Sequence, residues 1–204
     1  MPSGGLSLCG RPRILFRVGK ERERGWRIVE SRVVIETPHL RLREDEIELP
    51  NGTRIGNYYV RESRGFTVVF AVTPDERVVL VRQYKHGVSH WVLELPAGAI
   101  DPGEAPEACA RRELAEETGY VAAGPALEHM GTFVYDPTSS TTRYHLYLAR
   151  GARKLLATSF DETEDIEVQL ASFEELRRYV RDGTIEVGTH IASIYYVLDR
   201  LGRL

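Results

Sequence analysis

From Trp26 onward, hydrophobic and polar residues alternate in short runs, which is the pattern of β-strands. RLREDEIEL (41–49) and RIGNYYV (54–60) flank PNG, a turn signal, and predict a β-hairpin. FTVVFAV (66–72) and RVVLVRQY (77–84) are mostly apolar, which predicts two strands buried on both faces of a sheet. Further strands are predicted at WVLELPAG, LEHMGTFVY, RYHLYLA and IEVQL.

Three segments favour helices instead. Pro106 is preferred in the first turn of a helix and Gly119 at the C-terminal cap, so a helix is predicted from about residue 105 to 118. SFEELRRYVRDG (172–183) and VGTHIASIYYVLDRLGRL (187–204) predict two closing helices. The order of these elements predicts an α/β fold, in which a mixed β-sheet is sandwiched between helices and follows an antiparallel β-hairpin subdomain.

The first part of the chain has a different character. Residues 1–25 mix Gly, Pro, Ser and scattered basic residues without helical or strand periodicity, so we expect a flexible N-terminal arm. No internal repeat or linker follows residue 25. The remainder is divided into an N-terminal β subdomain at 26–64 and a main domain at 65–204.

Composition narrows the possible partners. The chain has 204 residues with 42% hydrophobic and 28% charged content, which suits a folded domain with a sizeable core. Its formal charge of −3 argues against binding nucleic acid or an anionic membrane. Cys9 and Cys109 form neither a disulfide framework nor a zinc spacing. Because the sequence also lacks an apolar run of membrane-spanning length and a secretory signal, a cytoplasmic location is expected.

The predicted helix gathers like charge on one face. At about 100° per residue, Glu113, Glu116 and Glu117 fall within an arc of roughly 100°. Carboxylates held this close repel one another unless a cation lies among them. Oxygen ligands of this kind suit Mg²⁺ or Mn²⁺ together with substrate phosphates. The alternative is a solvated face that Arg111 and Arg112 neutralise.

The spacing of this segment favours the metal hypothesis. It fits G-x5-E-x7-R-E-U-x-E-E-x-G-U, where U is a bulky apolar residue, and Tyr120 places an aromatic in the last position. The other matching residues are Gly98, Glu104, Arg112, Glu113, Leu114, Glu116, Glu117 and Gly119. Average residue usage would produce the seven strictly specified positions about once in 10⁸ starting points. The segment resembles the Nudix box, and the chain is similar to the Nudix hydrolases, which cleave a nucleoside diphosphate linked to another moiety.

The resemblance implies a Nudix fold over residues 65–204 and a role for each box residue. Glu113 and Glu117 are expected as direct metal ligands, with Glu116 as a ligand or bridge and a catalytic residue, and the backbone carbonyl of Ala97 as a further ligand. Arg112 is expected to pair with a neighbouring carboxylate and so orient the acidic side chains. Gly98 and Gly103 are expected to allow the tight loop before the helix.

The flanks of the box resemble the ADP-ribose pyrophosphatase branch, on the run VVLVRQYKHGVSHWVLELPAGAIDPGE. This implies that Arg82 and Lys85 bind the substrate's phosphates. It also implies a homodimer formed through residues 26–64, with an aromatic stacked on the base. The candidates for that stacking are Trp26, Tyr58 and Tyr59, although packing within the sheet explains each of them equally well.

One downstream segment departs from the commoner pattern of that branch, S-P-G-x-S-D-E, because Thr142 stands where its catalytic glutamate would be. Other members carry this base in a loop before E-x-x-E-V, and FDETEDIEV aligns Glu164 with it, with Glu162 and Glu167 as alternatives. The pocket for the terminal sugar is expected to be lined by Asp136, Pro137, Thr138 and Ser139.

The function expected from this resemblance is Mg²⁺-dependent hydrolysis of the pyrophosphate bond in ADP-ribose or a related nucleoside diphosphate sugar. Two alternatives stay open: hydrolysis of dinucleotide polyphosphates or nucleoside triphosphates, and a non-catalytic Nudix ligand sensor. Cys109 is expected to be a small buried hydrophobe. No chemistry is assigned to the six histidines, because none has ligand spacing.

Overall fold

A computed structural model describes residues 25–124, 127–159 and 165–204. The predicted N-terminal arm, except for its last residue, lies outside the described residues, and so do Cys9, Glu162 and Glu164. Two compact units are present within the described part. One comprises residues 25–32 and 44–58, and the other comprises residues 33–43, 59–124, 127–159 and 165–204.

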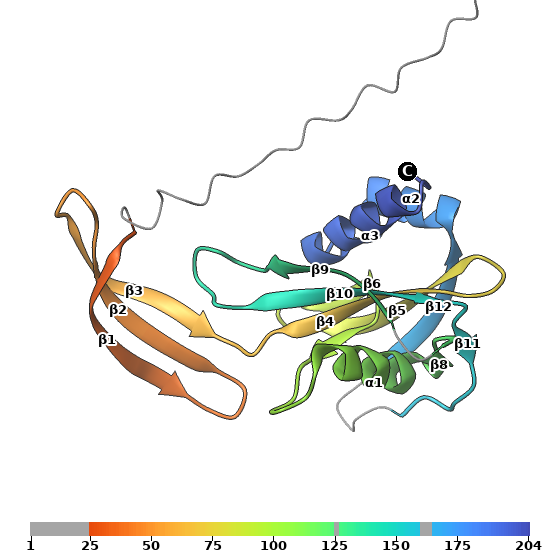
Figure 1. Cartoon of the computed structure of the whole chain (residues 1–204), viewed down its shortest axis with the longest axis horizontal. Coiled ribbons are helices and arrows are strands. Elements are labelled where there is room, and N and C mark those ends of the chain that lie inside the picture. Colours follow the sequence, from red (N-terminus) through yellow and green to blue (C-terminus); the bar gives the residue numbers. More distant parts are fainter. Residues whose placement is uncertain (1–24, 125–126, 160–164) are drawn as a thin grey trace, which may run out of the picture. The chain divides into compact units, whose positions relative to one another are not determined.

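The N-terminal strands form a three-stranded antiparallel sheet in the order β1-β2-β3 (Figure 1). Their bounds are Arg27–Glu36 for β1, Arg41–Glu48 for β2 and Arg54–Glu62 for β3. The predicted hairpin is therefore present as β2 and β3. Gly52 takes a φ of +82° in the turn between them, a conformation that suits glycine. Strand β1 was not predicted, and it leaves nearly all of its side chains exposed.

The main sheet contains seven strands, with β12-β5-β4-β10-β9 as its central path. Strand β6 pairs with β5, and β7 pairs with β4. The sheet is mixed, because β10 runs parallel to β4 while the other described strand pairs of the sheet are antiparallel. The bounds are β4 Phe66–Val72, β5 Arg77–Lys85, β6 His90–Glu94, β7 Ala97–Ala99, β9 Glu128–Val134, β10 Arg143–Arg150 and β12 Ile166–Ser172.

Helices cover both faces of this sheet (Figure 1). Helix α1 (Pro106–Thr118) contributes Ala110 and Leu114 to one buried cluster. Helices α2 (Phe173–Arg181) and α3 (Gly188–Arg200) contribute to the other cluster. Alternate residues of β4 enter opposite clusters, which explains why its sequence is almost wholly apolar. The predicted α/β class, with a mixed sheet between helices, is confirmed.

Helix α1 begins and ends close to the predicted residues. Pro106 occupies its first turn, and Gly119 caps its C-terminus with a φ of 73° while its N–H donates to the Ala115 carbonyl at 2.8 Å. Two short strands follow, β8 (Tyr120–Val121) and β11 (Arg153–Lys154), and neither was predicted. None of the described helices is both long and apolar enough to cross a membrane.

Candidate active site

Arg112 lies at the centre of the acidic residues of α1. Its guanidinium donates to Glu104 at 2.9 and 3.0 Å, to Glu113 at 2.7 Å and to Glu116 at 3.0 Å. It also donates to the Ala99 carbonyl at 3.2 Å. The hydrogen bonds from Arg112 lower the pKa of Glu104 to about 2. One cation therefore orients three carboxylates, which with Glu117 form what we call the carboxylate cluster.

Gly98 makes room for Glu113. A Cβ added to Gly98 would lie 1.9 Å from the Glu113 carboxyl carbon and about 2 Å from one carboxylate oxygen. Gly98 belongs to strand β7 and its φ lies outside the left-handed region, so the prediction that it serves the tight loop is wrong. Gly103 does serve that loop, with a φ of +81°. The glycine at the start of the box is needed because a carboxylate approaches the backbone closely.

Glu117 is the buried member of the carboxylate cluster, with only 4% of its surface exposed. One of its oxygens accepts a hydrogen bond from the Ala97 N–H at 3.0 Å. Burial raises the pKa of Glu117 to about 8, and the nearby charge of Glu113 adds to the shift. An ionised Glu117 is therefore costly in the protein alone.

The chemistry of these residues fits a hard divalent cation. Their side-chain donors are all carboxylate oxygens, the missing Cβ of Gly98 lets Glu113 reach the backbone of β7, and a cation would relieve the cost of ionising Glu117. In the described ranges no group of three or more His, Cys, Asp or Glu side chains is already arranged around a metal position. Arg112 is instead the cation that Glu113 and Glu116 contact.

A cavity of about 340 Å³ is lined by Ala97 and Gly98, the residues of β7 that adjoin Glu117 and Glu113 of the carboxylate cluster. The lining of this cavity also includes Lys85 and Thr142, two positions that the sequence singled out. The Lys85 ammonium lies 3.1 Å from Glu94, and the Thr142 hydroxyl lies 2.6 Å from that of Ser140. The full lining is Arg61, Ser63, Gly65, Phe66, Lys85, Glu94, Ala97, Gly98, Ala99, Tyr135, Thr142, Val187, Thr189 and His190.

The structure does not bring Arg82 together with Lys85. Arg82 lies outside the cavity lining, donates to Glu167 of β12 at 2.9 Å and stacks over Trp91 at 4.8 Å from the ring centroid. Residues three apart on a strand point to opposite faces of the sheet, which explains the separation. Glu167, the described alternative for the catalytic base, is thus paired with Arg82. The preferred base, Glu164, and the other alternative, Glu162, lie outside the described residues.

The other predicted substrate residues lie outside the cavity lining. Trp26 is 53% exposed and meets Tyr58 edge to face at 6.1 Å between ring centroids within the N-terminal sheet, and Tyr59 is also exposed. Pro137, Thr138 and Ser139 belong to a loop that Asp136 organises, because its carboxylate accepts the N–H groups of Thr138 and Ser139 at 3.0 and 3.3 Å.

Sequence reasoning missed several residues of the cavity. Arg61 carried no recognisable sequence signal, yet it lines the cavity. Its backbone N–H donates to the Ser139 carbonyl at 2.8 Å, and its carbonyl accepts from the Thr141 N–H at 3.0 Å. Glu94 stood in the quoted LELPAG run without an assigned role, and it proves to be almost fully buried. His190 contacts Glu94 from α3, and burial lowers its pKa to about 4. Only the packing of α3 against the strand ends reveals this histidine.

Comparison with known proteins agrees with the geometry. The family model described as NUDIX domain matches residues 62–187, and the model described as Nucleoside diphosphate sugar hydrolase N-terminal domain matches residues 26–60. A crystal structure of an ADP compounds hydrolase has a TM-score of 0.75 and 22% identity, covering 88% of this chain and 97% of that one. This structural similarity supports the assignment of the fold.

Two curated relatives extend the similarity. The methanol dehydrogenase activator of Bacillus methanolicus is 31% identical over 159 residues, covering 78% of this chain and 84% of the relative. The ADP-ribose pyrophosphatase of Bacillus subtilis (strain 168) is 30% identical over 154 residues, covering 75% of this chain and 82% of the relative. Members of this family generally use a divalent metal. The resemblance seen in the box is confirmed, and the chain belongs to the Nudix hydrolases, in their nucleoside diphosphate sugar hydrolase branch.

Proposed function

We propose that this protein hydrolyses the pyrophosphate bond of ADP-ribose or a related nucleoside diphosphate sugar in a Mg²⁺-dependent reaction, giving a nucleoside monophosphate and a sugar phosphate. The observation that supports this most directly is the carboxylate cluster beside a cavity lined by Lys85 and Arg61. Ala97 and Gly98 line the cavity and adjoin Glu117 and Glu113, so oxygen donors for a cation lie next to two basic residues suited to phosphates. The relative named ADP-ribose pyrophosphatase favours that substrate within the class.

In this proposal Glu113, Glu116 and Glu117, with the carbonyl of Ala97, hold Mg²⁺, for which Mn²⁺ can substitute. When bound, the metal neutralises the diphosphate and lowers the pKa of a bound water. Arg112 keeps the carboxylates oriented, and Lys85 and Arg61 bind phosphate oxygens.

The chemical step needs one water molecule and a base. The water oxygen bonds to one phosphorus, the bridging P–O bond breaks, and the Glu164 carboxylate accepts the proton that the water releases. Glu164→Gln should lower kcat strongly with a modest change in KM. An unchanged kcat would assign the base to another glutamate of the same loop.

Recognition of the two ends of the substrate is also part of the proposal. Residues 26–64 form a homodimer, and Trp26 or Tyr58 stacks on the base. Pro137, Thr138 and Ser139 contact the terminal sugar, and Arg82 is a candidate for contact with the phosphates. These assignments rest on the resemblance within the family, and the exposed Trp26 ring is compatible with stacking on a ligand.

The test is hydrolysis by the purified protein with Mg²⁺, with Mn²⁺ and with a chelator. The substrates are ADP-ribose, ADP-glucose, GDP-mannose, UDP-glucose, a diadenosine polyphosphate and a nucleoside triphosphate. Metal-dependent release of AMP and ribose 5-phosphate from ADP-ribose ahead of the others is expected. A preference for the diadenosine polyphosphate or the nucleoside triphosphate would instead support an enzyme for dinucleotide polyphosphates or nucleoside triphosphates. Tight binding without turnover of any substrate would identify a ligand sensor.

A further inference from the structure

Glu94 is a buried carboxylate that three polar side chains contact. It is 4% exposed, and one oxygen accepts from the Gln83 amide at 2.8 Å and lies 3.1 Å from the Lys85 ammonium. The other oxygen lies 3.2 Å from Nε2 of His190. A carboxylate removed from water is tolerated only when hydrogen bonds and opposite charge replace its hydration. Each of these three partners therefore matters for where the carboxylate points.

His190 has a defined tautomer in this network. Its Nδ1 lies 3.1 Å from the backbone N–H of Leu95, which has a hydrogen to donate, so Nδ1 is the acceptor and carries no proton. The proton of the neutral ring is then on Nε2, the nitrogen that lies 3.2 Å from Glu94. His190 is itself only 4% exposed, so its ring cannot turn away into solvent. The histidine thus fixes one oxygen of Glu94 from the N-terminal part of α3.

The network ends at the cavity. Lys85 has a long flexible side chain that is 44% exposed, and the order of that side chain depends on its partner. Its ammonium is close enough to Glu117 to act against the burial-driven rise in the pKa of that carboxyl. Lys85 therefore interacts with Glu94 and also with Glu117 of the carboxylate cluster. It lines the cavity in which the diphosphate of a substrate would bind.

We propose that His190 is a positioning residue, which holds the Glu94 carboxylate in place and thereby fixes the Lys85 ammonium for the diphosphate of the substrate. This inference rests on the proposed function. His190 acts without contacting the reacting atoms, and its effect reaches the substrate only through Lys85.

The sharpest test compares two substitutions that each keep one of the two polar contacts of the histidine ring. His190→Gln can place an N–H near the position of Nε2 and so keep the contact with Glu94, while His190→Asn can keep an acceptor for Leu95 but is too short to reach Glu94. The dissociation constant of ADP-ribose in chelator, and kcat and KM with Mg²⁺, are measured for both. We expect His190→Asn to weaken binding and raise KM roughly tenfold, and His190→Gln to stay within about threefold of wild type.

A double-mutant cycle with Lys85→Met tests whether the effect travels through the lysine. In the Lys85→Met background, His190→Asn should change the dissociation constant less than about twofold, because the group it positions is gone. Ser193→Ala removes another buried hydrogen bond of α3, to the Thr189 carbonyl at 2.7 Å, and should leave binding unchanged. Equal losses in both lysine backgrounds, or a loss with Gln but not with Asn, would overturn the proposal.

A second readout does not depend on turnover. In ¹H–¹⁵N spectra that detect lysine ammonium groups, the Lys85 signal should be visible in the wild type and in His190→Gln but lost in His190→Asn. If the wild type neither binds nor hydrolyses any nucleoside diphosphate sugar, the proposed function fails. The ammonium signal then still decides whether His190 positions Lys85, and its persistence in His190→Asn would refute the inference.

Discussion

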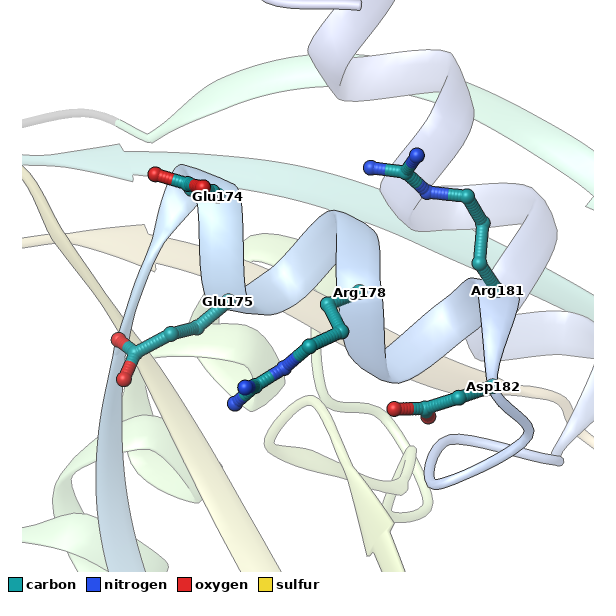
Figure 2. Close-up of a pocket in the computed structure, with 5 residues that line it drawn as sticks. All are labelled: Glu174, Glu175, Arg178, Arg181 and Asp182. Atoms are coloured by element: carbon teal, nitrogen blue, oxygen red, sulfur yellow. The ribbon is translucent and has the colours of Figure 1, made fainter.

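Helices α1 and α2 are both short and highly charged, but they use charge in opposite ways. The charges of α1 are drawn into the protein, where Glu117 is buried and Arg112 contacts three carboxylates. The charged side chains of α2 line a pocket at the surface, and Figure 2 shows them along the helix and its C-terminal end. Glu174, Glu175, Arg178, Arg181 and Asp182 line it, and all five belong to α2 and its C-terminal cap.

The two helices also differ in how they are stabilised. Helix α2 begins with a capping box, in which Ser172 and Glu175 satisfy each other's backbone N–H groups. Helix α1 has no side-chain cap and depends on Pro106, on the packing of Ala110 and Leu114, and on the contacts of Arg112. Buried charges that destabilise the fold, as in α1, indicate a functional site. Exposed charges that water solvates, as in α2, indicate an ordinary protein surface. Matched substitutions in the two helices can test this contrast.

The largest expected effect is the loss of catalysis in the Glu117→Gln variant. This substitution keeps the shape of the side chain but removes its charge. Turnover of a nucleoside diphosphate sugar should be abolished while the fold is retained. Glu174→Gln is the matched control in α2 and should leave kcat/KM within about twofold, because Glu174 is solvated. Steady-state kinetics and circular dichroism check both variants. Activity retained in Glu117→Gln would refute its assignment to the metal site.

Gly98→Ala is expected to have the next largest effect. The new methyl group would displace the Glu113 carboxylate, which is the movable end of a side chain, so activity should fall roughly a hundredfold with little loss of stability. Gly183, after α2, has a φ of +81° and open space around it. Gly183→Ala should therefore show the reverse pattern, with about 1 kcal/mol lost in stability and normal activity. The contrast fails if both variants lose only stability.

The pH dependence of stability should also separate the helices. Native Glu117 keeps its proton up to a pKa of about 8, while the unfolded carboxyl releases it near 4.5, so its contribution to stability is present below pH 4.5 and lost as pH rises towards 8. Hydrogen bonds from Ser172 lower the pKa of Glu175, whose contribution is instead present above pH 4.5 and lost on acidification.

Urea unfolding midpoints between pH 5 and pH 8, measured in chelator, check the part of this prediction that concerns Glu117. Glu117→Gln should be less destabilised than the wild type as pH rises. Adding Mg²⁺ at pH 8 should raise the midpoint of the wild type more than that of Glu117→Gln. Parallel curves for the two proteins would show that Glu117 does not titrate as a buried carboxyl.

The smallest effect is expected from Ser172→Ala, which removes the cap of α2. Stability should fall by about 1 kcal/mol, because the Glu175 N–H loses its side-chain acceptor. Catalysis should not change, since α2 contributes nothing to the cavity lining. Chemical denaturation measured alongside kcat/KM checks both statements, and a selective loss of kcat would connect α2 with the active site.

Local chemistry made much of the fold predictable from the sequence. Pro106 and Gly119 bounded α1, and the apolar runs of β4 and β5 announced strands covered on both faces. Strand β1 was missed because its residues are nearly all exposed and carry little burial pattern. Strands β8 and β11 were missed because two residues cannot establish a period.

For the site, the sequence by itself determined which residue types gather in the box, because helical spacing places Glu113, Glu116 and Glu117 on one face. Only the tertiary structure decided their neighbours. It placed Gly98 against Glu113, brought His190 from α3 to Glu94, and assigned Lys85 but not Arg82 to the cavity. These contacts join residues far apart in the chain, and their geometry depends on how helices and strands pack, which no local periodicity encodes.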